Sequence, residues 1–180
     1  MQKIDLIISG GHLLLMDEKN TCLEGGAIAI DASFIIDIGR IDEISAKYSP
    51  RKTLLADDSL VMPGFINTHT HAAMTCFRGM ADDLDLMDWL NNYIFPAEAK
   101  NVNPHLAYWG SKLACAEMIK SGTTTFCDMY IHENETARAA KEAGLRCFVG
   151  EVLFDFPSPN CKTPSEALAY TRHLAQQWRN

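Results

Sequence analysis

The chain has 180 residues, of which 47% are hydrophobic and 22% are charged, and its formal net charge is −7 at pH 7. This length is enough to bury one core or slightly more. The negative charge and the lack of Lys and Arg clusters argue against partners such as nucleic acid or acidic membranes. We find no signal peptide, no apolar run near the ~18 residues that span a bilayer, and no C-x-x-C pair. We therefore expect a cytoplasmic protein with reduced cysteines.

The first 60 residues are expected to form short strands separated by turns. Gly10-Gly11 and Gly25-Gly26 mark two of the turns. Apolar and polar residues alternate in the segments between them, and this is the period of a half-buried strand. We predict a small antiparallel β unit without helices, with strands at residues 3–9, 12–17, 27–32 and 34–40.

From about residue 60 the pattern changes to strands that alternate with helices. Strands are predicted near residues 60–71, 123–131 and 146–154, and helices near residues 85–93, 104–121, 134–143 and 164–178. Such an alternation predicts right-handed crossovers and a parallel sheet.

Two helix predictions are specific enough to be tested. Asp85 should cap the first helix, and Pro96 should end or kink it. Asn103 followed by Pro104 should start the second helix, and Gly122 should close it. An apolar stripe on this second helix is expected to face the core: Leu106, Trp109, Leu113, Ala116 and Ile119.

His69-Thr70-His71 is the sharpest chemical feature of the sequence. In an extended strand, residues i and i+2 point to the same side, so both imidazoles can bind one ion. They follow an apolar strand, and parallel α/β folds place their sites at the carboxyl ends of strands. Imidazole nitrogen suits Zn²⁺, Fe²⁺ or Ni²⁺. We predict a site for one divalent metal, with zinc as the first choice.

The segment from Met62 to His71, MPGFINTHTH, resembles the first barrel strand of the amidohydrolase superfamily. This resemblance implies that residues 1–60 are strands of a composite β-sandwich. It implies that residues 61–180 are the first three βα units of a (β/α)8 TIM barrel of the metal-dependent hydrolase class, apparently truncated. His69 and His71 would be the metal ligands, and no catalytic residue is expected within this chain.

Within that superfamily the chain is most similar to methylthioadenosine/S-adenosylhomocysteine deaminases and related triazine hydrolases. The similarity implies hydrolytic deamination of an adenosine-type nucleoside, a small-molecule substrate. Glu98 matches an acidic residue that binds ribose hydroxyls, and Trp89 either stacks on the substrate ring or anchors its helix. The residues that carry the resemblance are Met74, the segments 78–84 and 94–98, Trp89-Leu90 and Asp128-Met129-Tyr130.

Several alternatives stay open. Some adenosine-type members carry an Arg where this chain has Gly150-Glu151, which leaves triazine, guanine or cytosine as other substrates. The chain could also be an inactive remnant or an assembly module, and a homo-oligomer is open. Asp128 either supports the metal or caps a strand end, and His132 is the one further histidine that merits inspection.

Overall fold

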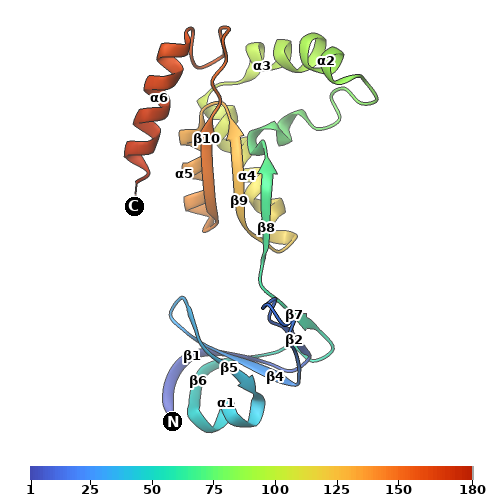
Figure 1. Ribbon diagram of the computed structural model, residues 1–180, viewed down its shortest axis with the longest axis vertical. Coiled ribbons are helices and arrows are strands. Elements are labelled where there is room, and N and C mark those ends of the chain that lie inside the picture. Colours follow the sequence, from blue (N-terminus) through green and yellow to red (C-terminus); the bar gives the residue numbers. More distant parts are fainter. Residues whose placement is uncertain (180) are drawn as a thin grey trace. The chain divides into compact units, whose positions relative to one another are not determined.

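The computed structural model describes residues 1–179 and divides into two compact units, Met1–Pro63 and a second unit that begins at Gly64 (Figure 1). The boundary falls within residues 60–71, where one strand was predicted; Leu60–Val61 is a strand of the first unit, and Phe65–Thr70 is a strand of the second. Each unit has its own hydrophobic core.

The first unit is built around a mixed four-stranded sheet in the order β5-β4-β1-β6. β4 runs antiparallel to β1 and to β5, whereas β6 runs parallel to β1. A smaller sheet has the order β3-β2-β7. The strands are β1 Gln2–Ser9, β2 His12–Leu14, β3 Cys22–Glu24, β4 Gly26–Asp31, β5 Phe34–Arg40, β6 Tyr48–Leu55 and β7 Leu60–Val61.

The prediction of a purely antiparallel unit without helices was wrong. Helix α1, Ile41–Lys47, lies between β5 and β6. It has seven residues and buries only Ile44, so it carries no helical periodicity that the sequence could reveal. β6 is an edge strand that is mostly exposed and contains Pro50, and such a polar segment resembles a loop.

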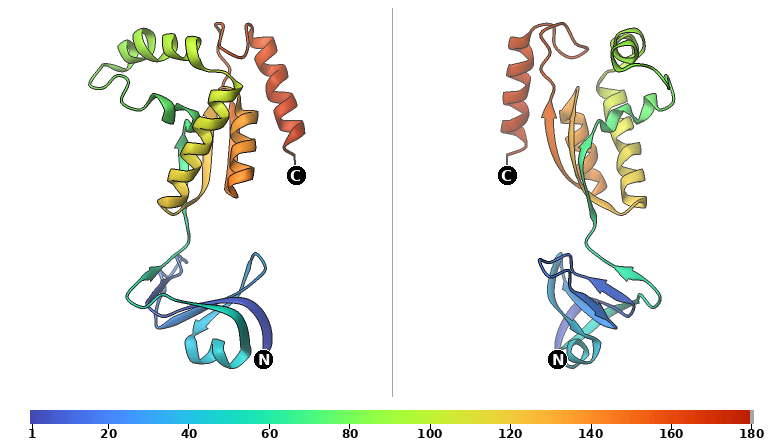
Figure 2. Two further views of the ribbon diagram at one scale, coloured as in Figure 1. Left: turned by 180° about the vertical axis from the view of Figure 1, so that it is seen from behind. Right: turned by 45° about the vertical axis from the view of Figure 1, so that its right-hand side comes forward.

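The second unit contains three parallel strands in the order β10-β9-β8. α4 connects β8 to β9, and α5 connects β9 to β10. Figure 1 shows the strands in front of both helices, and the left view of Figure 2, seen from behind, shows the helices in front, so α4 and α5 cover the same face of the sheet. The elements are β8 Phe65–Thr70, α4 Pro104–Lys120, β9 Thr123–Tyr130, α5 Glu133–Ala143, β10 Arg146–Glu151 and α6 Pro164–Gln177. The predicted alternation of strands and helices is confirmed, although β10 ends earlier than predicted.

Pro96 does not end the helix that was predicted before it. Helical structure runs without interruption from Leu86 to Asn101 as α2 (Leu86–Asp88), a π-helical turn η2 (Trp89–Ile94) and α3 (Phe95–Asn101). Pro96 is the second residue of α3, and inside this continuous helix its missing N–H group removes one helical hydrogen bond. In the π turn the Phe95 N–H bonds to the Leu90 carbonyl oxygen, five residues back, so the hydrogen-bond register changes directly before the proline. Asp85 stands at the N-cap, but its side chain makes no capping hydrogen bond.

The ends predicted for α4 are confirmed, but its orientation is not. Oδ1 of Asn103 accepts a hydrogen bond from the Leu106 N–H at 3.0 Å, and Gly122 has the positive φ (+82°) of a helix stop. The buried residues are small ones such as Gly110 and Ala114, whereas Trp109 is 56% exposed. A Cβ at Gly110 would lie 2.6 Å from the carbonyl oxygen of Ala73. The helix approaches its neighbour too closely for large side chains. Four members of the predicted apolar stripe are therefore exposed, while the fifth, Leu106, packs against the core as predicted.

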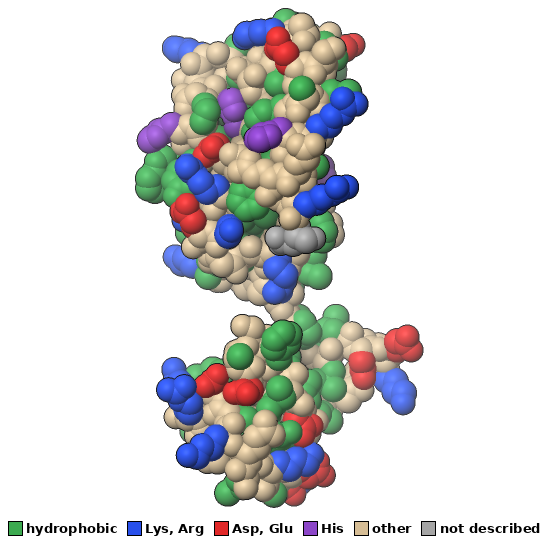
Figure 3. Space-filling model, turned by 90° about the vertical axis from the view of Figure 1, so that its left-hand side faces the viewer, with side chains coloured by type: hydrophobic (Ala, Val, Ile, Leu, Met, Phe, Trp, Pro, Cys, Tyr) green, Lys and Arg blue, Asp and Glu red, His purple; other side chains and the backbone are tan. Residues whose placement is uncertain are grey.

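The surface carries charges of both signs. Figure 3 shows Lys and Arg side chains scattered over the face that it draws, with Asp, Glu and hydrophobic side chains between them. Among residues 1–179, no helix has both the length and the apolar character that a membrane span requires.

Candidate functional site

The two histidines of the H-x-H motif lie together at the carboxyl end of β8. His69 belongs to the strand, and His71 follows it directly and precedes the short helix η1, Ala72–Phe77. Their ring centroids are 5.1 Å apart, and the rings are inclined at 79°. The structure thus brings the two predicted metal ligands into contact with each other.

The backbone of β9 fixes the proton of His71. Nδ1 of His71 lies 2.5 Å from the carbonyl oxygen of Met129. A carbonyl oxygen can only accept, so Nδ1 carries the hydrogen and donates it. The lone pair of the imidazole then resides on Nε2, which is the arrangement that metal-binding histidines use.

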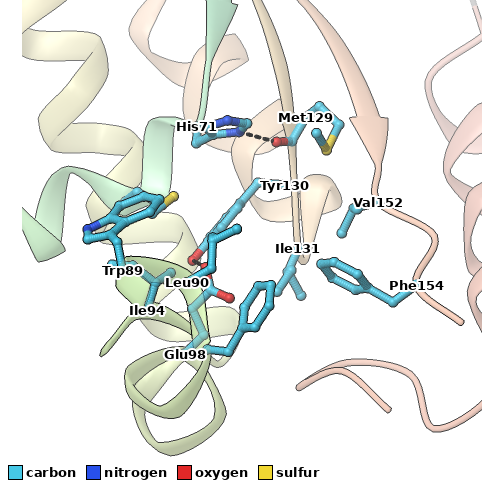
Figure 4. Close-up of a pocket in the computed structure, with 12 residues that line it drawn as sticks. His71, Trp89, Leu90, Ile94, Glu98, Met129, Tyr130, Ile131, Val152 and Phe154 are labelled. Atoms are coloured by element: carbon cyan, nitrogen blue, oxygen red, sulfur yellow. Dashed lines mark hydrogen bonds between the residues drawn. The ribbon is translucent and has the colours of Figure 1, made fainter. Parts of the chain in front are cut away.

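A cavity of about 250 Å³ opens beside His71 at the carboxyl ends of the strands (Figure 4). Trp89 and Glu98, the two residues predicted to contact the substrate, also line it, whereas His69 does not. Most of the wall is apolar, and it comes from η1, η2, α3, β9 and the segment after β10: Met74, Leu90, Ile94, Phe95, Met129, Tyr130, Ile131, Val152 and Phe154. His71 and Glu98, which are 27 positions apart in the chain, therefore share one cavity.

Glu98 is buried in α3, with 5% of its surface exposed. Its Oε1 accepts a hydrogen bond of 2.7 Å from the hydroxyl group of Tyr130. Burial raises the pKa of Glu98, while the Tyr130 hydrogen bond and the charge of His71 act in the opposite direction. Oε2 accepts no hydrogen bond from the part of the chain that the structure describes.

Trp89 begins the π-helical turn η2 and is half-buried. Its indole forms one wall of the cavity beside Leu90 and Ile94 (Figure 4). It faces the space where a planar ring could lie, and it also packs within its own helix. π turns often occur at functional sites, because they rotate the side chains that follow relative to a regular helix.

A second cavity of about 270 Å³ shares Phe95, Glu98 and Phe154 with the first. The segment after β10 supplies its other wall, which includes Phe156 and Lys162. The three phenylalanine rings pack against one another with centroids 4.7 to 6.2 Å apart.

Asp128 supports the segment that follows His71. It is 1% exposed, and its Oδ1 accepts a hydrogen bond from the Ala72 N–H at 2.9 Å. Asp128 was expected either to support the metal or to cap a strand end. The structure shows that it binds the backbone of the residue that follows His71. Burial, followed by the charge of Asp128, raises the pKa of the neighbouring Glu133 to about 10. This raised pKa favours the neutral acid form of Glu133 at neutral pH.

The remaining histidines do not join the pair. His132 is the N-cap of α5 in a left-handed conformation (φ 61°), and it lines a separate cavity with Tyr170 and His173. Within residues 1–179, no group of three or more His, Cys, Asp or Glu side chains is arranged to hold a metal ion. His69 and His71 therefore stand as a pair.

The sequence alone did not reveal the roles of the Met129 carbonyl and the Tyr130 hydroxyl. Both lie at the carboxyl end of β9, adjacent to β8 in the sheet. Their position at a strand end was the one available signal, because the ends of neighbouring parallel strands meet at the same edge.

The parallel α/β fold and the paired histidines are the features expected of a metal-dependent hydrolase, and comparison with known families agrees with that class. Residues 60–180 match the model of the amidohydrolase family. The chain belongs to this family. The mixed α/β structure corresponds to the N-terminal part of such proteins.

More particular similarities come from curated relatives. The chain is 62% identical over 178 residues to 5-methylthioadenosine/S-adenosylhomocysteine deaminase 1 of Syntrophus aciditrophicus (strain SB), covering 99% of this chain and 40% of the relative. It is 48% identical over 177 residues to the enzyme of the same activity from Syntrophobacter fumaroxidans, covering 98% of this chain and 40% of the relative. The chain thus spans about two fifths of the length of these relatives.

Solved structures share the fold. An adenosine deaminase from Xanthomonas campestris with bound zinc has a TM-score of 0.96 at 35% identity, covering 99% of this chain and 41% of that one. The atrazine chlorohydrolase of Arthrobacter aurescens TC1, complexed with zinc, has a TM-score of 0.80 at 18% identity, covering 97% and 43%. At that identity the second similarity supports the fold alone.

Proposed function

We propose that this chain supplies the metal-binding histidines and the nucleoside-binding wall of a hydrolytic deaminase. The substrate would be an adenosine-type nucleoside such as 5-methylthioadenosine or S-adenosylhomocysteine. The observation that carries the proposal is that His71, Trp89 and Glu98 line one cavity. The names of the two curated relatives and the zinc bound in the Xanthomonas adenosine deaminase support it.

His69 and His71 fit a divalent metal, with zinc preferred. Their rings adjoin, and the Met129 carbonyl leaves Nε2 of His71 free to bind. A bound divalent ion lowers the pKa of a water molecule, so that hydroxide is present at neutral pH. The two histidines would hold this ion, and the catalytic acids and bases are expected outside the described residues.

Glu98 would recognise the ribose. A carboxylate accepts hydrogen bonds from two hydroxyl groups, and a site built for such bonds rejects analogues that lack them. Trp89 would lie against the planar base, because an indole face and an amino-heterocycle stack favourably. The rest of the wall is apolar and would give the base a hydrophobic surface to lie against.

The second cavity would receive the substituent at the 5′ position. It continues the first cavity past Glu98, and its walls are phenylalanine rings suited to a thioether. Lys162 would attract the carboxylate of a longer amino-acid tail. We infer from this that both a methylthio group and a homocysteine group fit.

The test is a chimera in which this chain replaces the matching 40% of the Syntrophus relative. We expect ammonia release from 5-methylthioadenosine, tightly bound metal, and loss of both in His69→Ala. Glu98→Ala should weaken the binding of nucleosides much more than the binding of the free base adenine. Equal losses on nucleosides and free base would reject the role of Glu98, and an inactive chimera that still binds metal would favour an inactive remnant.

The 180-residue chain by itself should not release ammonia at a useful rate, because two ligands hold a catalytic ion weakly. Metal-dependent ammonia release from the isolated chain, abolished by His69→Ala, would contradict this. It would mean that self-assembly or a partner completes the site.

A further inference from the structure

The hydroxyl of Tyr130 and the carboxylate of Glu98 form a buried pair between β9 and α3. Each residue is 5% exposed, and 2.7 Å separates the phenolic oxygen from Oε1. In the part of the chain that the structure describes, the Tyr130 hydroxyl is the one hydrogen-bond donor that reaches the Glu98 side chain. This contact accounts for the orientation of the carboxylate.

The pair matters because the rest of the surrounding wall is apolar. Phe95, Leu90 and Ile131 offer the carboxylate no hydrogen bond, and burial in such a wall favours the neutral acid. A neutral acid keeps one oxygen as a donor, whereas an ionised carboxylate can accept from two hydroxyl groups. The Tyr130 hydroxyl favours the ionised form and occupies only one of the two oxygens.

The same strand end also holds His71. The Met129 carbonyl binds Nδ1 of His71, and the next residue, Tyr130, binds Glu98 (Figure 4). The Tyr130 ring lies between the two partners, with its centroid 6.2 Å from that of His71. Two consecutive residues of β9 thus set the positions of the proposed metal ligand and the proposed ribose acceptor.

We propose that Tyr130 is a positioning residue that selects for substrates with ribose hydroxyls, an inference that rests on the proposed function of Glu98. Its hydroxyl anchors Oε1, and this leaves Oε2 directed to the ligand. Tyr130 would not contact the reacting atoms. Its removal should therefore change the selectivity for hydroxyl groups and leave binding of the free base intact.

The chain offers a matched control for this experiment. The hydroxyl of Tyr108 donates to Oε2 of Glu142 at 2.6 Å, so it forms a second Tyr–Glu pair. That pair joins α4 to α5 and does not line the cavity. Tyr130→Phe and Tyr108→Phe remove the same chemical group from a site inside and a site outside the cavity.

The first measurement is carboxyl ¹³C NMR of the 180-residue chain, with the Glu98 signal assigned through Glu98→Gln. We expect Tyr130→Phe to raise the pKa of Glu98, because a hydrogen bond to the ionised form is lost. Tyr108→Phe should leave it unchanged. An unchanged pKa in Tyr130→Phe would overturn the proposal, provided that the amide spectrum shows the variant to be folded.

The second measurement compares the binding of adenosine, 2′,3′-dideoxyadenosine and adenine to the chimera described above, with and without Tyr130→Phe. We expect the wild-type preference for adenosine over the dideoxy compound to fall about tenfold in Tyr130→Phe, as for the loss of one hydrogen bond to a charged group. Adenine binding should change less than about twofold on the same scale. An unchanged preference would overturn the role of Tyr130. A wild-type chimera that binds none of the three would reject the proposed function, and the NMR titration of the 180-residue chain would still decide whether Tyr130 holds Glu98.

Discussion

At the scale of single residues, the proposed metal pair depends on one backbone carbonyl. The Met129 carbonyl keeps the hydrogen of His71 on Nδ1, so Nε2 is free for a ligand. His69 reaches the same place from the strand itself, with its ring centroid 5.1 Å away. The pairing requires both the i, i+2 spacing and the neighbouring strand.

His69→Ala or His71→Ala should each lower the Zn²⁺ affinity of the chain by about tenfold or more, since each removes one of two ligands. Competition with a chromophoric chelator would measure this. His105→Ala is the control, because His105 lies on α4 beside Trp109. Unchanged affinity in both His69→Ala and His71→Ala would contradict metal binding at this pair.

The buried acids predict a pH dependence of stability. The pKa of Glu133 is raised to about 10, first by burial and then by the charge of Asp128. A raised carboxyl pKa means that the folded state binds more protons than the unfolded state between about pH 4.5 and 10, so stability falls as pH rises through that window. Burial likewise raises the pKa of Glu151 to about 7, which adds to the fall below neutral pH.

Glu133→Gln should flatten this dependence by up to about 1.4 kcal/mol per pH unit, because a neutral amide replaces a group that must stay protonated. Urea unfolding at pH 6, 7.5 and 9 would measure the slope. Glu18→Gln, at an exposed position of the first unit, is the control. A slope unchanged by Glu133→Gln would show that this carboxyl does not carry the effect.

At the scale of elements, α4 reaches the site through its small residues. Gly110 faces the backbone of Ala73, two residues after His71, and a Cβ there would meet its carbonyl oxygen at 2.6 Å. The absence of a side chain lets α4 support η1 directly, and η1 continues from the second histidine. Helix packing thus determines where the proposed metal ligand stands.

Gly110→Ala should destabilise the second unit by about 1–3 kcal/mol through overpacking, which outweighs the gain of about 0.5–1 kcal/mol in helix propensity. Urea unfolding would measure this loss, and chelator competition should show weaker Zn²⁺ binding. Leu113→Ala on the exposed side of the same helix is the control. A Gly110→Ala variant as stable as the wild type would indicate that α4 can shift away from η1.

At the scale of the whole molecule, the parallel sheet of the second unit has open edges. Within the described residues, β8 pairs only with β9, and β10 also pairs only with β9. Ile66 is 68% exposed and Phe148 is 71% exposed. Parallel strands are normally buried on both faces, and unpaired apolar edges promote association.

The isolated chain should therefore self-associate with increasing concentration, and Ile66→Lys should reduce the association severalfold by charging the edge. Sedimentation velocity over a hundredfold concentration range would measure both. Leu168→Lys, on an exposed position of α6, is the control for added charge. A chain that stays monomeric throughout would show that these edges are protected.

The division of the chain and the barrel assignment also belong to this scale. The first unit would be part of a composite β-sandwich, and the second would be the first three βα units of a (β/α)8 barrel. The three parallel strands, their two covering helices and the alignment with 40% of each curated relative support this proposal. A crystal structure of the chimera described above would test it.

The sequence by itself determined the features that are local or periodic. Strand and helix alternation followed from hydrophobic period, Asn103 and Gly122 marked the ends of α4 through their capping chemistry, and the H-x-H spacing indicated the paired imidazoles. The family resemblance rested on the contiguous segment from Met62 to His71.

Only the tertiary structure decided which surfaces and side chains meet. The buried side of α4 was mispredicted because close approach to Ala73 demands small residues, and hydrophobicity alone does not encode that distance. α1 was missed because one buried residue, Ile44, gives no period. The Tyr130–Glu98 hydrogen bond joins residues 32 positions apart. Such contacts depend on how strands and helices pack, and the packing brings distant strand ends to one edge of the sheet.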